Sequence, residues 1–254
     1  MTPNEHVAAV SAETARFVAA VRSADPATPV PGCPGWTLAD LVRHTGSVQR
    51  WFTLLLRRRI QEPPTSREVD LKLPERVEDY PAWLAEACAE AGAAFAETDL
   101  DAPMWAWGAD QHARFWVRRM LFETLVHRAD AELALGLKPG IDPDLAADGV
   151  AEFLTNLPYA AFFAPRTAEL RGEDRTIRFA RTDGDGDWLV RLRPDGFGLD
   201  SADAPAGSPA DATVSATAAE LLLLLYGRLD RSTPTVTVSG DEGLLDLWFA
   251  NSAF

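Results

Sequence analysis

The sequence predicts a two-domain protein, with an all-α four-helix bundle over residues 1–160 and a small α+β domain over residues 161–254. Two observations carry this prediction. Apolar residues recur at helical spacing in the first part, whereas near Arg171 the spacing changes to the alternation typical of strands. The chain has 254 residues, of which 47% are hydrophobic, with eight Trp and twelve Phe, so it can build a sizeable core.

Four stretches of the first domain have helical periodicity, at residues 4–23, 37–59, 78–97 and 111–135. Asn4 is the expected N-cap of the first helix, and Thr37 is that of the second, where Asp40 completes a capping-box pattern. Gly136 is placed to end the fourth helix. Four helices of this length, joined partly by long connections, are typical of a four-helix bundle. Residues 142–156 predict a fifth helix that leads out of it.

The connections between these helices differ in composition. Asp25–Gly35 contains four prolines and two glycines, and residues 62–73 are polar with two prolines, so both are expected to be irregular. The next connection carries Trp105 and Trp107, which either line a substrate cleft or plug the end of the bundle, and we favour the plug. His112 follows at the start of the fourth helix, where it is expected to be exposed or to cap the helix.

The second domain is expected to contain a small sheet with helices. Residues 176–180 and 188–192 alternate apolar and polar side chains, and Asp-Gly-Asp-Gly at 183–186 predicts a hairpin turn between them. Further strands are expected at 198–201, 213–216 and 235–238, and helices at 218–226 and 242–250.

The charge of the chain restricts its partners. The formal net charge is −14, which disfavours nucleic acid and anionic membrane surfaces, because both require a clustered positive field. Two cysteines do not make a disulfide framework, and no apolar run approaches the length needed to cross a bilayer. Nothing in the sequence resembles a signal peptide, so we expect a soluble cytoplasmic protein.

Three side chains in the bundle have the chemistry of metal ligands. Glu123 and His127 lie four residues apart and therefore share one face of the fourth helix, and His44 lies on the apolar face of the second. Because lone buried polar groups are costly, these residues either hydrogen-bond to one another or hold a metal. Two imidazoles and one carboxylate leave coordination positions open, as in catalytic zinc sites, and the same set also suits non-haem iron.

Several motifs resemble those of the mycothiol-dependent maleylpyruvate isomerase family. Val30–His44 is similar to the family's opening motif, and Glu123–Glu132 to its second motif. Ala219–Arg228 and Val238–Asp241 are similar to its C-terminal domain. The resemblance spans essentially the whole chain and implies that the first domain is a DinB-like metal-binding four-helix bundle.

The resemblance also implies a reaction. The equivalents of His44, Glu123 and His127 in that family bind a divalent metal, usually assigned as zinc. A metal-bound thiol is deprotonated, so mycothiol could add as a thiolate to a conjugated double bond of a small electrophilic acid. Rotation about the new single bond and expulsion of the thiol would give a cis–trans isomerase, whereas stopping at the adduct would give a thiol S-transferase.

Other residues have secondary roles in this interpretation. Arg228 matches the family's arginine and is expected to hold an anionic substrate or the thiol, although an arginine that completes a helix C-terminus is also common. Asp130 either orients a ligand from behind or is a solvated carboxylate. Cys33 is expected to be a packed structural thiol. Phe122 stands where family members often carry a histidine, but this position is not one of the three ligands.

We therefore predict a mycothiol-dependent and metal-dependent enzyme, an isomerase or S-transferase, that acts on a small molecule. The alternative from another class is a metal-binding protein with a regulatory or scavenging role that has lost catalysis. A third alternative is a bundle in which Glu123 and His127 only pair with each other.

Overall fold

The computed structural model describes residues 1–64, 69–200 and 209–253, and the chain divides into two compact units, Met1–Gly140 and Ile141–Phe254. The helix α5 (Pro143–Asn156) begins the second unit. The sequence-based domain limits of 1–160 and 161–254 assign this helix to the first domain, and those limits stay a prediction. Among the described residues, no helix combines the length and the apolar character that crossing a bilayer requires.

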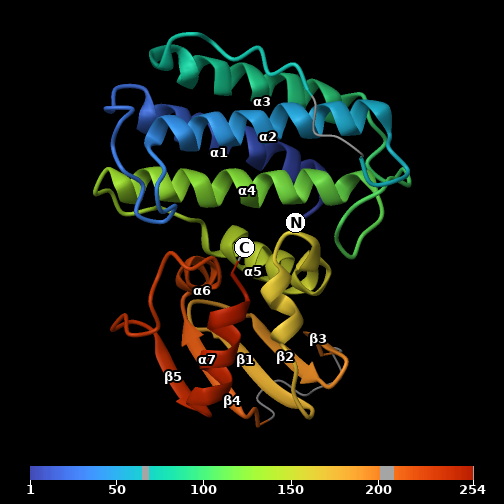
Figure 1. Ribbon diagram of the computed structural model, residues 1–254, viewed down its shortest axis with the longest axis vertical. Helices are drawn as coiled ribbons and strands as arrows, with labels where there is room; N and C mark the ends of the chain where they lie inside the picture. The colour runs from blue at the N-terminus through green and yellow to red at the C-terminus, as the bar shows by residue number, and fades with distance from the viewer. Residues whose placement is uncertain (65–68, 201–208, 254) are drawn as a thin grey trace. The chain divides into compact units, whose positions relative to one another are not determined.

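Long helices make up the first unit and run alongside one another (Figure 1). They are α1 (Pro3–Val21), α2 (Leu38–Arg58), α3 (Tyr80–Ala96), which follows the short η1 (Val77–Asp79), and α4 (Ala113–Ala134). The helix α1 packs against α3 and α4, and α2 packs against the same two helices. This confirms the predicted helical N-terminal part. Residues 65–68 of the expected connection 62–73 lie outside the described part of the chain.

The helix starts follow local hydrogen-bonding rules. At α2 the predicted capping box is confirmed, because Asp40 N donates to Thr37 Oγ1 at 3.3 Å and Thr37 N donates to Asp40 Oδ2 at 3.1 Å. The expectation for α1 was wrong, since Thr2 and not Asn4 is its N-cap. Thr2 forms a capping box with Glu5, and this pairing places Asn4 inside the first turn.

A close approach sets the spacing of α2 and α3. A Cβ atom added at Gly46 of α2 would lie 2.2 Å from the indole ring of Trp83, which is buried on α3. Only a residue without a side chain allows this contact, because the large indole fills the space where a Cβ would be. The close packing of α2 against α3 therefore depends on Gly46.

A buried charge network joins α1 to α4. The fully buried Arg128 guanidinium donates to Glu13 Oε2 on α1 and to Glu132 Oε2 on its own helix, each at 2.5 Å. Buried charges are tolerated when they are paired and hydrogen-bonded, and Arg128 meets both conditions. The network fixes how α4 lies against α1.

In the described part of the second unit, five strands form a mixed sheet that packs with helices. Its strands are β1 (Arg175–Arg181), β2 (Asp187–Arg193), β3 (Gly196–Leu199), β4 (Ala212–Ala216) and β5 (Thr237–Gly240), in the order β3-β2-β1-β4-β5. Strands β1 and β4 are parallel, and the other neighbours are antiparallel. The predicted hairpin between β1 and β2 is confirmed. Ser201, the expected end of the third strand, lies outside the described residues.

The last strand begins later than residues 235–238 predict. Val236 N donates to Thr233 O at 2.9 Å in a turn, so this part of the chain cannot yet pair with a neighbouring strand. The strand β5 therefore starts at Thr237 and pairs with β4 as far as Gly240, which has φ +91° and lies so close to Asp211 that a Cβ would not fit.

Helices complete the core of the second unit. They are α5, α6 (Ala218–Leu225) and α7 (Glu242–Asn251), with the short η2 (Leu157–Phe162) and η3 (Pro165–Glu169). The helix α6 packs against α5, β1 and β4. On α7, the fully buried ring of Trp248 lies 5.6 Å from the ring of Phe179 on β1 and 5.8 Å from that of Phe197 on β3. This confirms the predicted α+β C-terminal part.

Candidate metal centre

The three ligand candidates meet between α2 and α4. His44 Nε2 lies 2.9 Å from Glu123 Oε1, and His127 Nε2 lies 3.3 Å from the same oxygen. One ligand atom from each residue lies within 4.8 Å of the other two. The two α4 residues are neighbours because they are one turn apart, whereas His44 reaches them only because α2 packs against α4.

The three side chains of the cluster differ in their exposure to solvent. The side chain of His127 is 11% exposed, that of Glu123 is 23% exposed and that of His44 is 35% exposed. His44 is therefore the most exposed member of the cluster and His127 the most buried. Arg119 Nη2 lies 3.5 Å from Glu123 Oε2.

The electrostatics of the cluster favour a charged pair. Burial raises the pKa of Glu123, but hydrogen bonds from His127 and His44 outweigh it and hold this pKa well below its usual value. Burial lowers the pKa of His127, but the hydrogen bond to Asp130 and the carboxylate of Glu123 hold that pKa well above its usual value. Without a metal, a carboxylate and an imidazolium face each other.

The second ring nitrogen of His127 also has a carboxylate partner. His127 Nδ1 lies 3.0 Å from Asp130 Oδ2, and Asp130 is fully buried. Of the two interpretations of Asp130, the solvated carboxylate is therefore wrong. The i,i+3 spacing on α4 was the sequence signal for this contact.

Sequence reasoning missed two neighbours that come from the Pro- and Gly-rich connection Asp25–Gly35 and the residue after it. Cys33 Sγ donates to Asp130 Oδ2 at 3.4 Å, so this thiol lies beside the cluster. The centroid of the Trp36 ring lies 4.9 Å from the centroid of the His44 ring and 6.2 Å from that of the His127 ring. An irregular connection has no periodicity from which the directions of its side chains could be derived. The only sequence signal for these two residues was that both lie in the motif Val30–His44.

The donor set fits a divalent ion. Two ligands of one tetrahedral zinc ion, each about 2.0–2.2 Å from it, lie about 3.3–3.6 Å apart. The observed 2.9 Å and 3.3 Å separations of His44 Nε2 and His127 Nε2 from Glu123 Oε1 are close to this range. A second possible group, Cys33 with His127 and Asp130, shares one histidine with the first.

Arg228 belongs to the second unit, where it follows α6 and the left-handed Gly227. Its Nη1 donates to Tyr226 O at 2.6 Å, and its backbone N donates to Leu223 O at 2.7 Å. These contacts are those of an arginine that completes a helix C-terminus. Its expected part in binding an anion stays a prediction.

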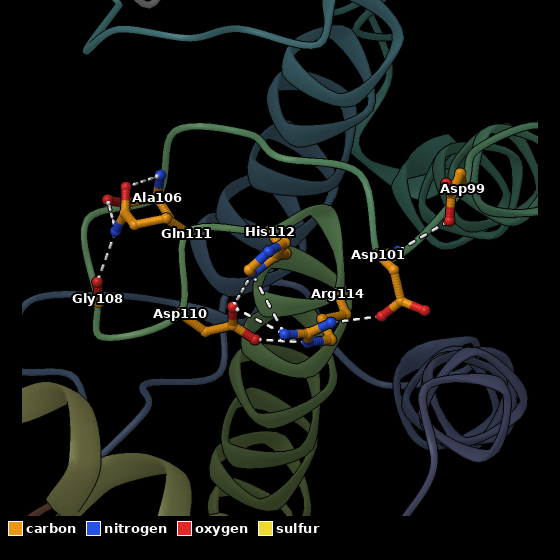
Figure 2. Close-up of polar contacts among 8 residues, drawn as sticks. All are labelled: Asp99, Asp101, Ala106, Gly108, Asp110, Gln111, His112 and Arg114. Atoms are coloured by element: carbon orange, nitrogen blue, oxygen red, sulfur yellow. Dashed lines mark hydrogen bonds and ion pairs between the residues drawn. The ribbon is translucent and has the colours of Figure 1, made fainter.

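His112, which the sequence analysis also considered, lies at the start of α4 (Figure 2). His112 precedes the helix without a side-chain capping bond, and its Nδ1 lies 2.5 Å from Asp110 Oδ1. Asp110 Oδ2 also accepts from Arg114 Nε at 2.7 Å. His112 is half-buried, with 37% of its side chain accessible, and it makes no side-chain capping bond, so the capping role is wrong.

The tryptophans of this connection pack onto α4. The ring of Trp105 lies 5.8 Å from that of Trp116, and the ring of Trp107 lies 5.2 Å from that of Phe115. Trp116 Nε1 also donates to Trp105 O at 2.8 Å. Both rings therefore pack against the start of α4, and their role as a plug of the bundle end stays a prediction.

Comparisons with known proteins agree with the motifs. The mycothiol maleylpyruvate isomerase N-terminal domain matches residues 7–132, and the MDMPI C-terminal domain matches residues 144–247. No curated protein matches the sequence.

Two solved structures share the fold. The crystal structure of the mycothiol-dependent maleylpyruvate isomerase superposes with a TM-score of 0.64 at 15% identity, over 94% of this chain and 93% of that one. A histidine-to-alanine mutant of that enzyme gives the same values. Because the two domain matches together span both units, the chain belongs to the mycothiol maleylpyruvate isomerase family.

Proposed function

We propose that this protein is a metal-dependent enzyme that uses mycothiol as a thiol cosubstrate and acts on a small electrophilic acid. The reaction would be a cis–trans isomerisation or a thiol S-transfer. The observation that carries the proposal is the convergence of His44 Nε2 and His127 Nε2 on one oxygen of Glu123, on a side of α4 that is partly open. Family membership supports the use of mycothiol.

The residues of the cluster suit zinc. Its set of two imidazoles and one carboxylate leaves positions free for a thiol. A bound divalent ion would supply a lowered thiol pKa, and therefore a nucleophile at neutral pH. His44 and His127 would hold it through neutral Nε2 atoms, and Glu123 would contribute the negative charge. The indole of Trp36 would form one wall beside the two imidazoles.

Arg228 is the proposed anion-binding residue. A guanidinium has five donors in a planar fork that matches a carboxylate. We propose that this side chain holds the anionic substrate or the thiol. Its support is the match to the family's arginine in the motif Ala219–Arg228.

The first experiment is elemental analysis of untagged protein. We expect near-stoichiometric zinc in the wild type, loss of zinc in His44→Ala, and retention in His112→Ala. His112 is the matched control, because it lies in the same unit and pairs with Asp110 outside the cluster. Absence of metal from the wild type, even after reconstitution with zinc, would contradict the metal-dependent function. It would favour the alternative in which Glu123 and His127 only pair with each other.

A second experiment separates the enzyme from a non-catalytic metal binder. Zinc-loaded protein is incubated with mycothiol and maleylpyruvate, and both the thiol and the double-bond isomers are followed. An isomerase converts the isomer without consuming thiol, whereas an S-transferase consumes one thiol per adduct. Bound zinc without either activity would favour a regulatory or scavenging role. Arg228→Ala should keep its zinc and lose most turnover, and unchanged turnover would contradict the proposed role of Arg228.

A further inference from the structure

Two residues that the proposed function does not use, Asp130 and Cys33, lie on the Nδ1 side of the His127 ring. We propose that Asp130 is a positioning residue that directs His127 Nε2 into the metal centre, and that the Cys33 thiol in turn positions Asp130. This inference rests on the proposed metal site.

The two nitrogens of His127 face different partners. Nδ1 lies 3.0 Å from Asp130 Oδ2, and Nε2 lies 3.3 Å from Glu123 Oε1. A carboxylate on Nδ1 keeps the proton on that nitrogen and leaves the Nε2 lone pair for a metal. Asp130 thus selects both the tautomer and the orientation of the ring.

Burial makes Asp130 an effective support. Its carboxylate is fully buried, and a buried carboxylate must be hydrogen-bonded. Oδ2 accepts from both His127 Nδ1 and the Cys33 thiol at 3.4 Å. A carboxylate held at one oxygen by two donors has little freedom to rotate, so it can restrain the imidazole.

The contact of Cys33 also joins two elements. Cys33 lies in the irregular connection before α2, whereas Asp130 lies on α4, 97 residues further along the chain. Trp36 follows three residues after Cys33 and lies beside both histidine rings. The thiol–carboxylate hydrogen bond therefore also helps to place the connection that carries the indole.

The same atoms offer a competing arrangement, in which Cys33, His127 and Asp130 are themselves the ligands. That ion would take Nδ1 of His127 and would lie against a fully buried carboxylate, with little room for an exchangeable ligand. The cluster of His44, Glu123 and His127 is more exposed and can admit a thiol. We therefore assign Cys33 and Asp130 to support and not to coordination.

The test measures zinc Kd by chelator competition. We expect Asp130→Asn to weaken binding about 10–100-fold, the usual effect of losing such a partner of a metal-bound histidine. Glu132→Gln is the matched control, because it removes another buried α4 carboxylate, one bound to Arg128 and not to His127. It should change stability and leave the zinc Kd unchanged. A wild-type Kd in Asp130→Asn would overturn the inference.

Variants of Cys33 provide a second, independent test of the inference. Cys33→Ala should weaken zinc binding by a smaller factor, and Cys33→Ser should restore it, because a hydroxyl can donate to the same oxygen. A Co²⁺-loaded protein should lack a thiolate-to-cobalt charge-transfer band. That band, or complete loss of metal in Cys33→Ala, would overturn the inference in favour of direct coordination.

Nitrogen-15 NMR of the histidine rings separates this inference from the proposed function. In zinc-loaded wild type, the Nδ1–H signal of His127 should be present and strongly downfield, and Asp130→Asn should shift it upfield, because a neutral amide accepts a weaker hydrogen bond than a carboxylate. If the wild type binds no zinc, the proposed function fails. If it binds zinc and the Nδ1 signal is the same in both proteins, only the positioning role fails.

Discussion

The imidazole of His127 lies between the carboxylates of Glu123 and Asp130, and this arrangement makes the metal-free protein sensitive to pH. The pKa of His127 is raised well above 6.5, so the native state keeps a proton that the unfolded chain has already lost at higher pH. The pKa of Glu123 is held well below 4.5, so its stabilising contribution is lost as the pH falls and not as it rises. The two residues stabilise the protein most between about pH 4.5 and pH 6.5, the ordinary pKa values of the two groups.

We expect the free energy of unfolding of metal-stripped protein to show this window. The contribution of His127 is fully present below about pH 6.5 and is lost as the pH rises through its folded pKa, at up to about 1.4 kcal/mol per pH unit. The contribution of Glu123 is present above about pH 4.5 and is lost as the pH falls through its own folded pKa. Urea denaturation at a series of pH values measures both limbs.

His127→Gln serves as the comparison for the alkaline limb. The variant has no imidazolium, so its stability should not fall over the range in which the wild type loses stability. Parallel profiles of the two proteins would show that His127 carries no raised pKa. Zinc should reverse the trend in the wild type, because binding through Nε2 needs the neutral ring and therefore strengthens as the pH rises.

At the scale of the helices, the position of His44 depends on how α2 packs. Gly46 lies two residues after His44, and a Cβ there would overlap the buried ring of Trp83. The start of α2 is fixed independently by the Thr37–Asp40 capping box. The packing against α3 and the cap together hold His44 on the side of α2 that meets α4.

We expect Gly46→Ala to destabilise the protein by about 1–3 kcal/mol, because overpacking a buried contact forces the ring or the helix to move. Gly92→Ala on α3 is the matched control, since no described atom lies within 4 Å of a Cβ there. That variant should be neutral or stabilised by about 0.5–1 kcal/mol through helix propensity. Thermal or urea unfolding measures both, and equal effects would mean that the close contact is absent.

At the scale of the whole molecule, the charge opposes the proposed substrate. The net charge is −14, so an acidic substrate approaches through a repulsive field and must be captured by local groups such as the proposed Arg228. Salt shortens the range of this field, to about 8 Å at physiological ionic strength.

We therefore expect kcat/KM for an anionic substrate to rise between about 0.01 M and about 0.15 M salt, since screening weakens the repulsion. A neutral ester of the same acid should show no such rise. Steady-state kinetics at several salt concentrations measures the effect. A fall of kcat/KM with salt would show instead that a local positive field controls capture.

The sequence by itself determined the elements and their order. Helical periodicity up to about residue 160 and alternation after Arg171 are local properties, and so are the capping box at Thr37 and the turn at 183–186. Local rules failed where two neighbouring residues compete. Thr2 and Asn4 are both good N-caps, and the reach of Glu5 back to Thr2 decided between them.

Only the tertiary structure decided which side chains meet. His44 and Glu123 are 79 residues apart, and Cys33 and Asp130 are 97 apart, so their contacts depend on how helices and an irregular connection pack. The parallel pairing of β1 with β4 is likewise non-local. Sequence periodicity gives the face of a helix on which His44 lies, but the rotation and depth of that helix against α4 follow from close packing, as at Gly46 and Trp83.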